Sequence, residues 1–217
     1  KLALVIRQAT DALNAYEHSK ALEVIESFFW QFCDDYIELV KNRAYGTADA
    51  HGKVPSDAAV KSARTTLGLG LDAFARLLAP YLPFATEEVW SWMHTGEGSV
   101  HRAAWPKADI YAAAATGASP ETLAWAGKAV EQLRKIKSEA KVSMKTPILS
   151  VTLAAVKDGI DAIKSALDDV AQAGRVIGKF DLAEKHAEEA AAEGEGDDTV
   201  VIDASELGEP PAKKAKK

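Results

Sequence analysis

A helical repeat of apolar residues between about Lys20 and Arg43 constrains the fold of this chain more than any other feature. The apolar side chains recur at spacings of three and four, which places them on one face of a single long amphipathic helix. They are Leu22, Ile25, Phe29, Phe32, Cys33, Tyr36, Ile37 and Val40. Ser19 is placed to cap the first turn. A helix of this length needs neighbours to cover its apolar face, so we expect a helix bundle.

Three further helices are predicted in the first half of the chain. One spans residues 2–14, a second starts at the cap Ser56 and runs to about Tyr81, and a short third helix opens at residues 86–90. The side chains expected to point inward are Leu4, Val5, Ala9, Ala12 and Leu13 in the first, and Val60, Leu67, Leu71, Phe74 and Leu78 in the second. Residues 96–120 are expected to form a long connection.

The second half of the chain predicts a small α+β unit. Ser119-Pro120-Glu121 is a helix-start signal, with a cap, a proline at the first position and an acid, and the helix is expected to continue to about Ala140. The expected order after it is a strand at 148–155, a helix at 157–173, a strand near 176–183 and a third strand at 199–202. Between the last two strands, the Ala/Glu run 184–198 predicts a solvated loop or frayed helix. The predicted fold is mainly α: a helix bundle over 1–117, a small α+β appendage over 118–207 and a disordered Lys-rich tail over 208–217.

Composition excludes several classes of protein. No apolar run reaches eighteen residues, so we expect no membrane span. Cys33 is the only cysteine, which rules out an intramolecular disulfide and a thiolate metal cluster and fits the cytoplasm. The five histidines are scattered, so no metal site is expected. The first residue is Lys1, not Met, and we interpret the chain as a piece of a longer polypeptide.

The charge is unevenly distributed along the chain, although the net charge is −6. Residues 1–117 carry 11 basic and 14 acidic side chains, residues 118–176 carry 9 and 7, and residues 177–217 carry 6 and 11. A local field, not the total charge, steers a nucleic acid. The middle segment is therefore the one with a local excess of basic residues, and the largest excess of acid lies at the C-terminal end.

Two groups of basic residues are candidates for contacting RNA. The first follows one helix face at spacings of three and four, and comprises Arg134, Lys137, Lys141 and Lys145. The second comprises Lys20, Lys41, Arg43 and Arg64 on two bundle helices. Basic rows of this kind make phosphate tracks, because each neutralised phosphate releases counterions. The alternatives are a solvated face for the first group and stabilisation of a helix C-terminus for the second.

The aromatic and glycine motifs are interpreted as packing features. Phe28-Phe29-Trp30-Gln31-Phe32 holds more rings than one core can accept, so at least one must point sideways or outward. We expect Trp30 or its neighbours to be mainly structural, with base stacking as the alternative. Trp90 and Trp92 should lie on different helix faces. Gly68-Leu69-Gly70 predicts a close helix contact, not a phosphate cradle, and no catalytic set of residues stands out.

Three ordered segments resemble the anticodon-binding domain of class I aminoacyl-tRNA synthetases. They are the run Ala21 to Arg43 with Phe29-Trp30 and Phe32-Cys33-Asp34-Asp35-Tyr36, the run Leu77-Leu78-Ala79-Pro80-Tyr81-Leu82-Pro83-Phe84 to Trp90, and Ser99-Val100-His101-Arg102-Ala103-Ala104-Trp105-Pro106. The helix from Val130 to Met144 is most similar to the post-bundle helix of bacterial valyl enzymes. Residues 148–203 show no sustained heptad, unlike the coiled-coil arm of many valyl enzymes.

The resemblance implies that the chain is the C-terminal, tRNA-binding part of a ligase that joins valine to its tRNA with ATP and magnesium. The piece itself would need no cofactor and would be inactive alone, because the catalytic domain is absent. Its partner would be a valine tRNA, and it would act as a monomer in the cytoplasm. Three alternatives stay open: the equivalent part of an isoleucyl or leucyl enzyme, a helical protein-interaction module, and a small-molecule enzyme.

Overall fold

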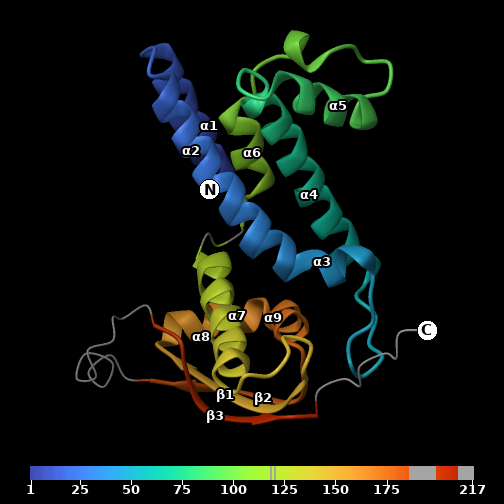
Figure 1. Cartoon of the computed structure of the whole chain (residues 1–217), viewed down its shortest axis with the longest axis vertical. Coiled ribbons are helices and arrows are strands. Elements are labelled where there is room, and N and C mark those ends of the chain that lie inside the picture. The colour runs from blue at the N-terminus through green and yellow to red at the C-terminus, as the bar shows by residue number, and fades with distance from the viewer. Residues whose placement is uncertain (118, 120, 186–198, 210–217) are drawn as a thin grey trace. The chain divides into compact units, whose positions relative to one another are not determined.

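The chain forms two compact units, one helical and one mixed (Figure 1). The computed structural model describes residues 1–117, 119, 121–185 and 199–209. The first unit comprises residues 1–37 and 61–117, and the second comprises residues 38–60 and the described residues from 119 onward. The predicted fold class, a helix bundle followed by a small α+β appendage, is confirmed. The predicted tail at 210–217 and most of the run 184–198 lie outside the described residues.

Helices make up the first unit, and those predicted over 2–14 and from Ser56 to about Tyr81 form close to their predicted bounds. They are α1 (Leu2–Asn14), α2 (His18–Gln31), the π-helical segment η1 (Phe32–Ile37), α4 (Asp57–Leu78, of which residues 61–78 belong to this unit), α5 (Pro83–Met93), the 3₁₀ turn η2 (Val100–Arg102) and α6 (Ala108–Ala114). Ser56 caps α4 as predicted, since its Oγ accepts a bond from the Ala59 amide at 3.3 Å. Three expectations were wrong, beginning with the single long helix from Lys20 to Arg43, which η1 interrupts after Gln31. Ser19 lies inside α2, whose N-cap is Glu17, and α6 occupies part of the expected connection.

A cluster of phenylalanine rings joins α2 and η1 to α4. The ring of Phe74 lies 5.9, 5.2 and 5.4 Å from those of Phe28, Phe29 and Phe32, measured between centroids. Gly70 permits this approach, because a Cβ there would lie only 2.6 Å from Cζ of Phe32. The predicted close helix contact at the Gly-Leu-Gly motif is therefore confirmed.

Two leucines that were expected in the core of this unit are exposed. Leu4 and Leu71 both point to solvent, while their neighbours Val5, Ile6 and Phe74 are buried. The predicted Val5, Ala9 and Ala12 of α1 and Phe74 of α4 are buried, so each predicted stripe is wrong at one edge position and not along its length. Side-chain spacing alone does not tell which edge position faces the core, because packing partners decide it.

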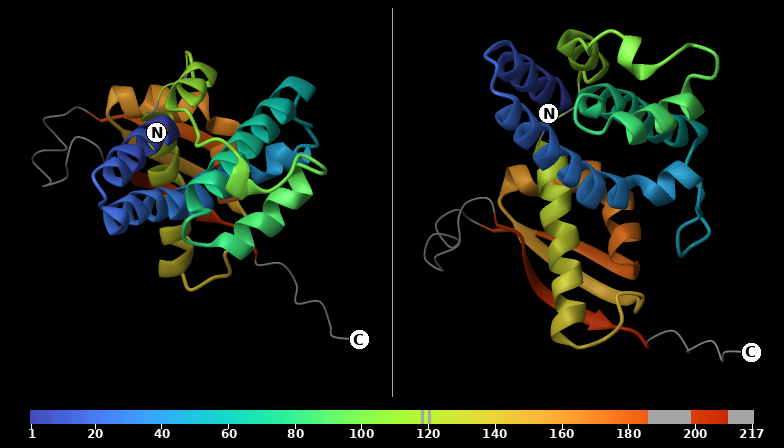
Figure 2. Two further views of the ribbon diagram at one scale, coloured as in Figure 1. Left: turned by 90° about the horizontal axis from the view of Figure 1, so that it is seen from above. Right: turned by 45° about the horizontal axis from the view of Figure 1, so that its top comes forward.

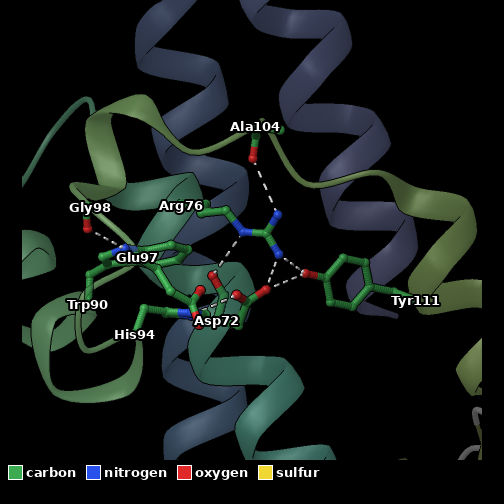
Figure 3. A network of polar contacts seen from close by, with 8 residues as sticks. All are labelled: Asp72, Arg76, Trp90, His94, Glu97, Gly98, Ala104 and Tyr111. Atoms are coloured by element: carbon green, nitrogen blue, oxygen red, sulfur yellow. Dashed lines mark hydrogen bonds and ion pairs between the residues drawn. The ribbon is translucent and has the colours of Figure 1, made fainter.

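A polar network fastens α4 to α5 and α6 (Figure 3). The Arg76 guanidinium pairs with Asp72, one turn away, and donates to Tyr111 Oη at 2.7 Å; Tyr111 Oη in turn donates to Asp72 at 2.9 Å. His94 stacks on Trp90 with ring centroids 3.8 Å apart, and its Nε2 lies 3.4 Å from Asp72. Burial, followed by the hydrogen bond to Asp72, raises the pKa of Tyr111 to about 12. These contacts make the network a structural element of the unit.

The second unit combines five helical segments or helices with a three-stranded sheet. Its elements are α3 (Glu38–Tyr45), the first turn of α4, α7 (Glu121–Glu139), β1 (Ile148–Ala155), α8 (Lys157–Ser165), α9 (Leu167–Gly174), β2 (Val176–Glu184) and β3 (Val201–Leu207). The strand order is β2-β1-β3, with β2 parallel and β3 antiparallel to the central strand β1. The predicted strands at 148–155 and 176–183 are confirmed. The helix predicted at 157–173 is instead two helices, broken at Ala166.

Helices α7, α8 and α9 cover one face of the sheet, and the right-hand view of Figure 2 shows them on the same side of the strands. The core between these layers is formed by residues that are at most 5% exposed: Leu133, Ile148, Val151, Leu153, Ile160, Ile163 and Val170. The parallel pair β1–β2 needs a crossover connection, and α8 with α9 supplies it. As a result, the C-terminal end of α9 and the beginning of β1 lie next to each other: the Ile148 amide donates to the Arg175 carbonyl at 2.9 Å.

Candidate nucleic-acid interface

The basic residues predicted in the first unit lie on exposed helix surfaces. Lys20 pairs with Glu17 across one turn of α2, at 2.9 Å, and this hydrogen bond raises the pKa of the lysine. Arg64 is exposed on α4. Exposed pairs within one helix contribute little to stability, so Lys20 can exchange Glu17 for another anion at small cost.

The two basic residues predicted near the end of the long helix belong to the second unit, and each has a carboxylate partner there. Lys41 pairs with Glu38 at 2.7 Å. Arg43 makes a two-bond contact with Asp169 of α9, from Nε to Oδ1 at 3.0 Å and from Nη2 to Oδ2 at 2.9 Å. Burial raises the pKa of Asp169, and the Arg43 guanidinium opposes that rise. Arg43 thus holds α3 against α9, a role that neither phosphate binding nor the helix-dipole alternative predicted.

Lys137 is not on an exposed basic face, contrary to prediction. Its side chain is buried, with 2% of the residue exposed, and Nζ donates to the carbonyls of Gly174 at 2.7 Å and Met144 at 3.3 Å. Burial is the main reason why its pKa falls to about 8, and the positive charges of Arg175 and Arg134 lower it further. Helix geometry explains why Lys137 is buried. This lysine follows the buried Leu133 by four residues, so both side chains lie on the same face of α7. A phosphate cannot reach it.

The other three members of the α7 row remain at the surface. Arg134 is exposed and lies 3.6 Å from Glu38. Lys141 and Lys145 are exposed in the turns between α7 and β1, and no carboxylate of the described residues pairs with either. A further exposed cation, Arg175, lies at the turn between α9 and β2. Arg175 was not among the predicted RNA-contacting residues, and the only sequence signal for it is its position directly after an expected helix end.

Large aromatic rings are exposed on the first unit. Trp30 is 55% exposed, and its Nε1 donates to Glu26 at 3.4 Å. Of the block that was expected to be mainly structural, Phe28, Phe29 and Phe32 pack against the core. Trp30 is the ring that points outward, so the structural role holds for its neighbours and not for Trp30 itself. Trp90 is buried and Trp92 exposed, as their spacing predicted. Exposed rings of this kind are suited to stacking on unpaired bases.

Two further findings concern sites of other kinds. Within residues 1–117, 119, 121–185 and 199–209, no group of three or more His, Cys, Asp or Glu side chains is placed to hold a metal ion. No helix in the described part of the chain combines the length and the apolar character that crossing a membrane requires.

Comparison with known proteins gives one consistent match. The family of anticodon-binding domains of tRNA ligases matches residues 1–153. The valine–tRNA ligase of Bifidobacterium longum (strain NCC 2705) is 79% identical over 216 residues, which is 100% of this chain and 24% of that protein. The valine–tRNA ligase of Cutibacterium acnes is 42% identical over 212 residues, or 98% of this chain and 22% of its own length. The chain thus spans about a quarter of the length of the curated relatives it matches.

Proposed function

The chain belongs to the family of anticodon-binding domains of tRNA ligases, and from this premise we propose that it binds the anticodon stem-loop of a valine tRNA. The observation that carries the proposal is identity of 79% along the whole chain to a protein named valine–tRNA ligase. Isoleucyl and leucyl enzymes are the alternatives that this observation disfavours.

The surface of the chain is consistent with such a ligand. An anticodon loop offers unpaired bases and a phosphate backbone, and proteins bind these with aromatic rings and cations respectively. Trp30 and Trp92 supply exposed rings on the first unit, and Lys141, Lys145 and Arg175 supply exposed cations on the second. Because the surface offers both rings for unpaired bases and cations for phosphates, it supports recognition of RNA over recognition of a protein partner.

We assign the chemistry of the whole protein to the part that this chain does not include. On this proposal the parent ligates valine to its tRNA in the cytoplasm as a monomer, with ATP and magnesium bound elsewhere. Among the described residues, no group of three or more His, Cys, Asp or Glu side chains could hold a metal ion. The task of the chain is to fix the anticodon arm so that the distant acceptor end of the tRNA reaches the catalytic domain.

We expect the 217-residue chain to bind a valine-tRNA anticodon stem-loop weakly and with a strong dependence on salt. Each phosphate contact should contribute about 0.7–0.9 to the slope of log affinity against log salt concentration. Fluorescence anisotropy of a labelled stem-loop at several salt concentrations measures that slope. Binding that does not change with salt, or no binding at millimolar protein, would contradict the proposal.

A further inference from the structure

The buried ammonium of Lys137 brings two turns of the second unit together. Its Nζ donates to the Gly174 carbonyl at 2.7 Å and to the Met144 carbonyl at 3.3 Å, so these two oxygens lie no farther apart than the sum of both distances. Lys145 directly follows one carbonyl in the chain and Arg175 directly follows the other. Two exposed cations thirty positions apart in sequence are therefore attached to neighbouring backbone segments.

A third cation joins them because α7 ends at the same place. The Val142 amide donates back to the Lys137 carbonyl at 3.0 Å, and this closes the last turn of the helix around Lys141. Lys141 and Arg175 both occupy the left-handed backbone region, with φ of 53° and 56°. Glycine is the usual residue at such helix ends, because a side chain there costs about 1 kcal/mol. Both helix ends instead carry a long basic side chain.

Within the described residues, no carboxylate neutralises these cations. All three are exposed, and no carboxylate in the described ranges forms an ion pair with Lys141, Lys145 or Arg175. Within the described ranges, the buried Lys137 ammonium donates to two carbonyl oxygens, and the charges of Arg175 and Arg134 add to the lowering of its pKa. Three exposed cations are thus attached to backbone segments that meet around this ammonium. An external anion would relieve their mutual repulsion.

We infer that Lys141, Lys145 and Arg175 form a binding corner for phosphates of an RNA backbone, at the end of the sheet where α7 and α9 terminate. The inference rests on the proposed function and adds a site to it. The planar guanidinium of Arg175 can hold two oxygens of one phosphate, while the two lysines act as point charges. Because phosphates carry no sequence information, this corner orients the RNA without reading its bases.

The test compares two triple variants of the 217-residue chain. In the first, Lys141→Gln, Lys145→Gln and Arg175→Gln neutralise the corner. In the matched control, Lys61→Gln, Lys107→Gln and Lys157→Gln remove the same charge from exposed lysines for which no ion pair is found within the described residues. The probes are the valine-tRNA anticodon stem-loop and an unrelated RNA hairpin, each titrated at several salt concentrations.

The corner variant should lower the magnitude of the salt slope by at least about 0.7–0.9, the value for one phosphate contact, and should do so equally for both RNAs. The control should keep a slope close to that of the unmodified chain. If the corner variant and the unmodified chain had equal salt slopes, the inference of a phosphate-binding corner would be overturned, and the proposed function would stay intact. Equal losses in both variants would also overturn it, since they would show only an effect of total charge. Failure of the unmodified chain to bind either RNA would overturn both proposals.

A competing explanation is that these cations only stabilise the C-terminal ends of α7 and α9. On that explanation the corner variant loses stability and keeps its RNA affinity. Urea unfolding of both variants, followed by circular dichroism, therefore accompanies the binding measurements. If the corner variant has lower stability and unchanged RNA binding, the result supports the helix-end explanation and contradicts the inference that these cations bind phosphates.

Discussion

Lys137→Glu is expected to reduce the free energy of unfolding by roughly 3–5 kcal/mol, the cost of a buried charge without a partner. The new carboxylate would face the carbonyl oxygens of Gly174 and Met144, which now accept hydrogen bonds from the ammonium. Both oxygens would lose their donor at a site where water has little access. Urea unfolding monitored by circular dichroism measures the change.

Two other variants separate the effects of charge and of lost hydrogen bonds. Lys135→Glu reverses an exposed charge on the same helix and should change the stability by no more than about 0.5 kcal/mol. Lys137→Met keeps the buried stem and removes only the donor, which should cost about 1–3 kcal/mol. If Lys137→Glu proved as stable as Lys135→Glu, Lys137 would not be buried. The Lys137 ammonium would then not hold together the turns at Met144 and Gly174.

Gly178→Ala is expected to destabilise the second unit by about 3 kcal/mol or more. A Cβ at this position would lie 1.9 Å from the backbone carbonyl oxygen of Leu149, and a backbone atom cannot move aside as a flexible side chain can. The register between β1 and β2 shifts at this point, between Ile148 and Ser150, so β2 bulges where Gly178 sits. Glycine is the residue that such a close approach of two strands permits.

Gly127→Ala is the matched control for this substitution. Gly127 lies within α7, and nothing would contact an added Cβ within 4 Å. Alanine there should stabilise the chain by about 0.5–1 kcal/mol, because glycine is the poorer helix former. Thermal unfolding should therefore shift in opposite directions for the two variants. A Gly178→Ala variant as stable as the unmodified chain would contradict the β1–β2 register described above.

Local signals in the sequence located most elements of the second unit. The cap at Ser119 is formed, since its Oγ accepts from the Glu121 amide at 3.3 Å, and α7 ends one residue before the predicted Ala140. The strand at 148–155 begins and ends where its alternation predicts. Caps and alternating patterns depend on residues close in sequence, so they can be recognised without tertiary information.

The predictions that failed depend on contacts between distant residues. Arg43 and Asp169 are 126 positions apart, and nothing near Arg43 indicates that it pairs with a carboxylate of α9. Lys137 was assigned to the surface by its charge, although its spacing from Leu133 places it on the buried stripe. At Lys137, helical periodicity predicts burial correctly and residue type does not. The ammonium tolerates burial because two carbonyl oxygens accept its hydrogen bonds and its long aliphatic stem packs in the core.

The aromatic block at residues 28–32 shows the same limit. Its composition required one ring to leave the core, but only the packing of α2 and η1 against Phe74 decides that this ring is Trp30. The π-helical turn from Phe32 to Ile37 has no counterpart in the predicted uninterrupted helix. It changes which side chains face inward after Gln31. No local sequence signal marked it.

The central claim is that this chain recognises the anticodon arm of a valine tRNA, and a competition experiment tests it most directly. A labelled valine-tRNA anticodon stem-loop bound to the chain is displaced by unlabelled stem-loops that differ only in the three anticodon bases. We expect the valine anticodon to compete at least about tenfold better than a replaced anticodon, a difference of about 1.4 kcal/mol. Equal displacement by both stem-loops would show that the chain holds RNA only through its backbone, and would contradict the claim.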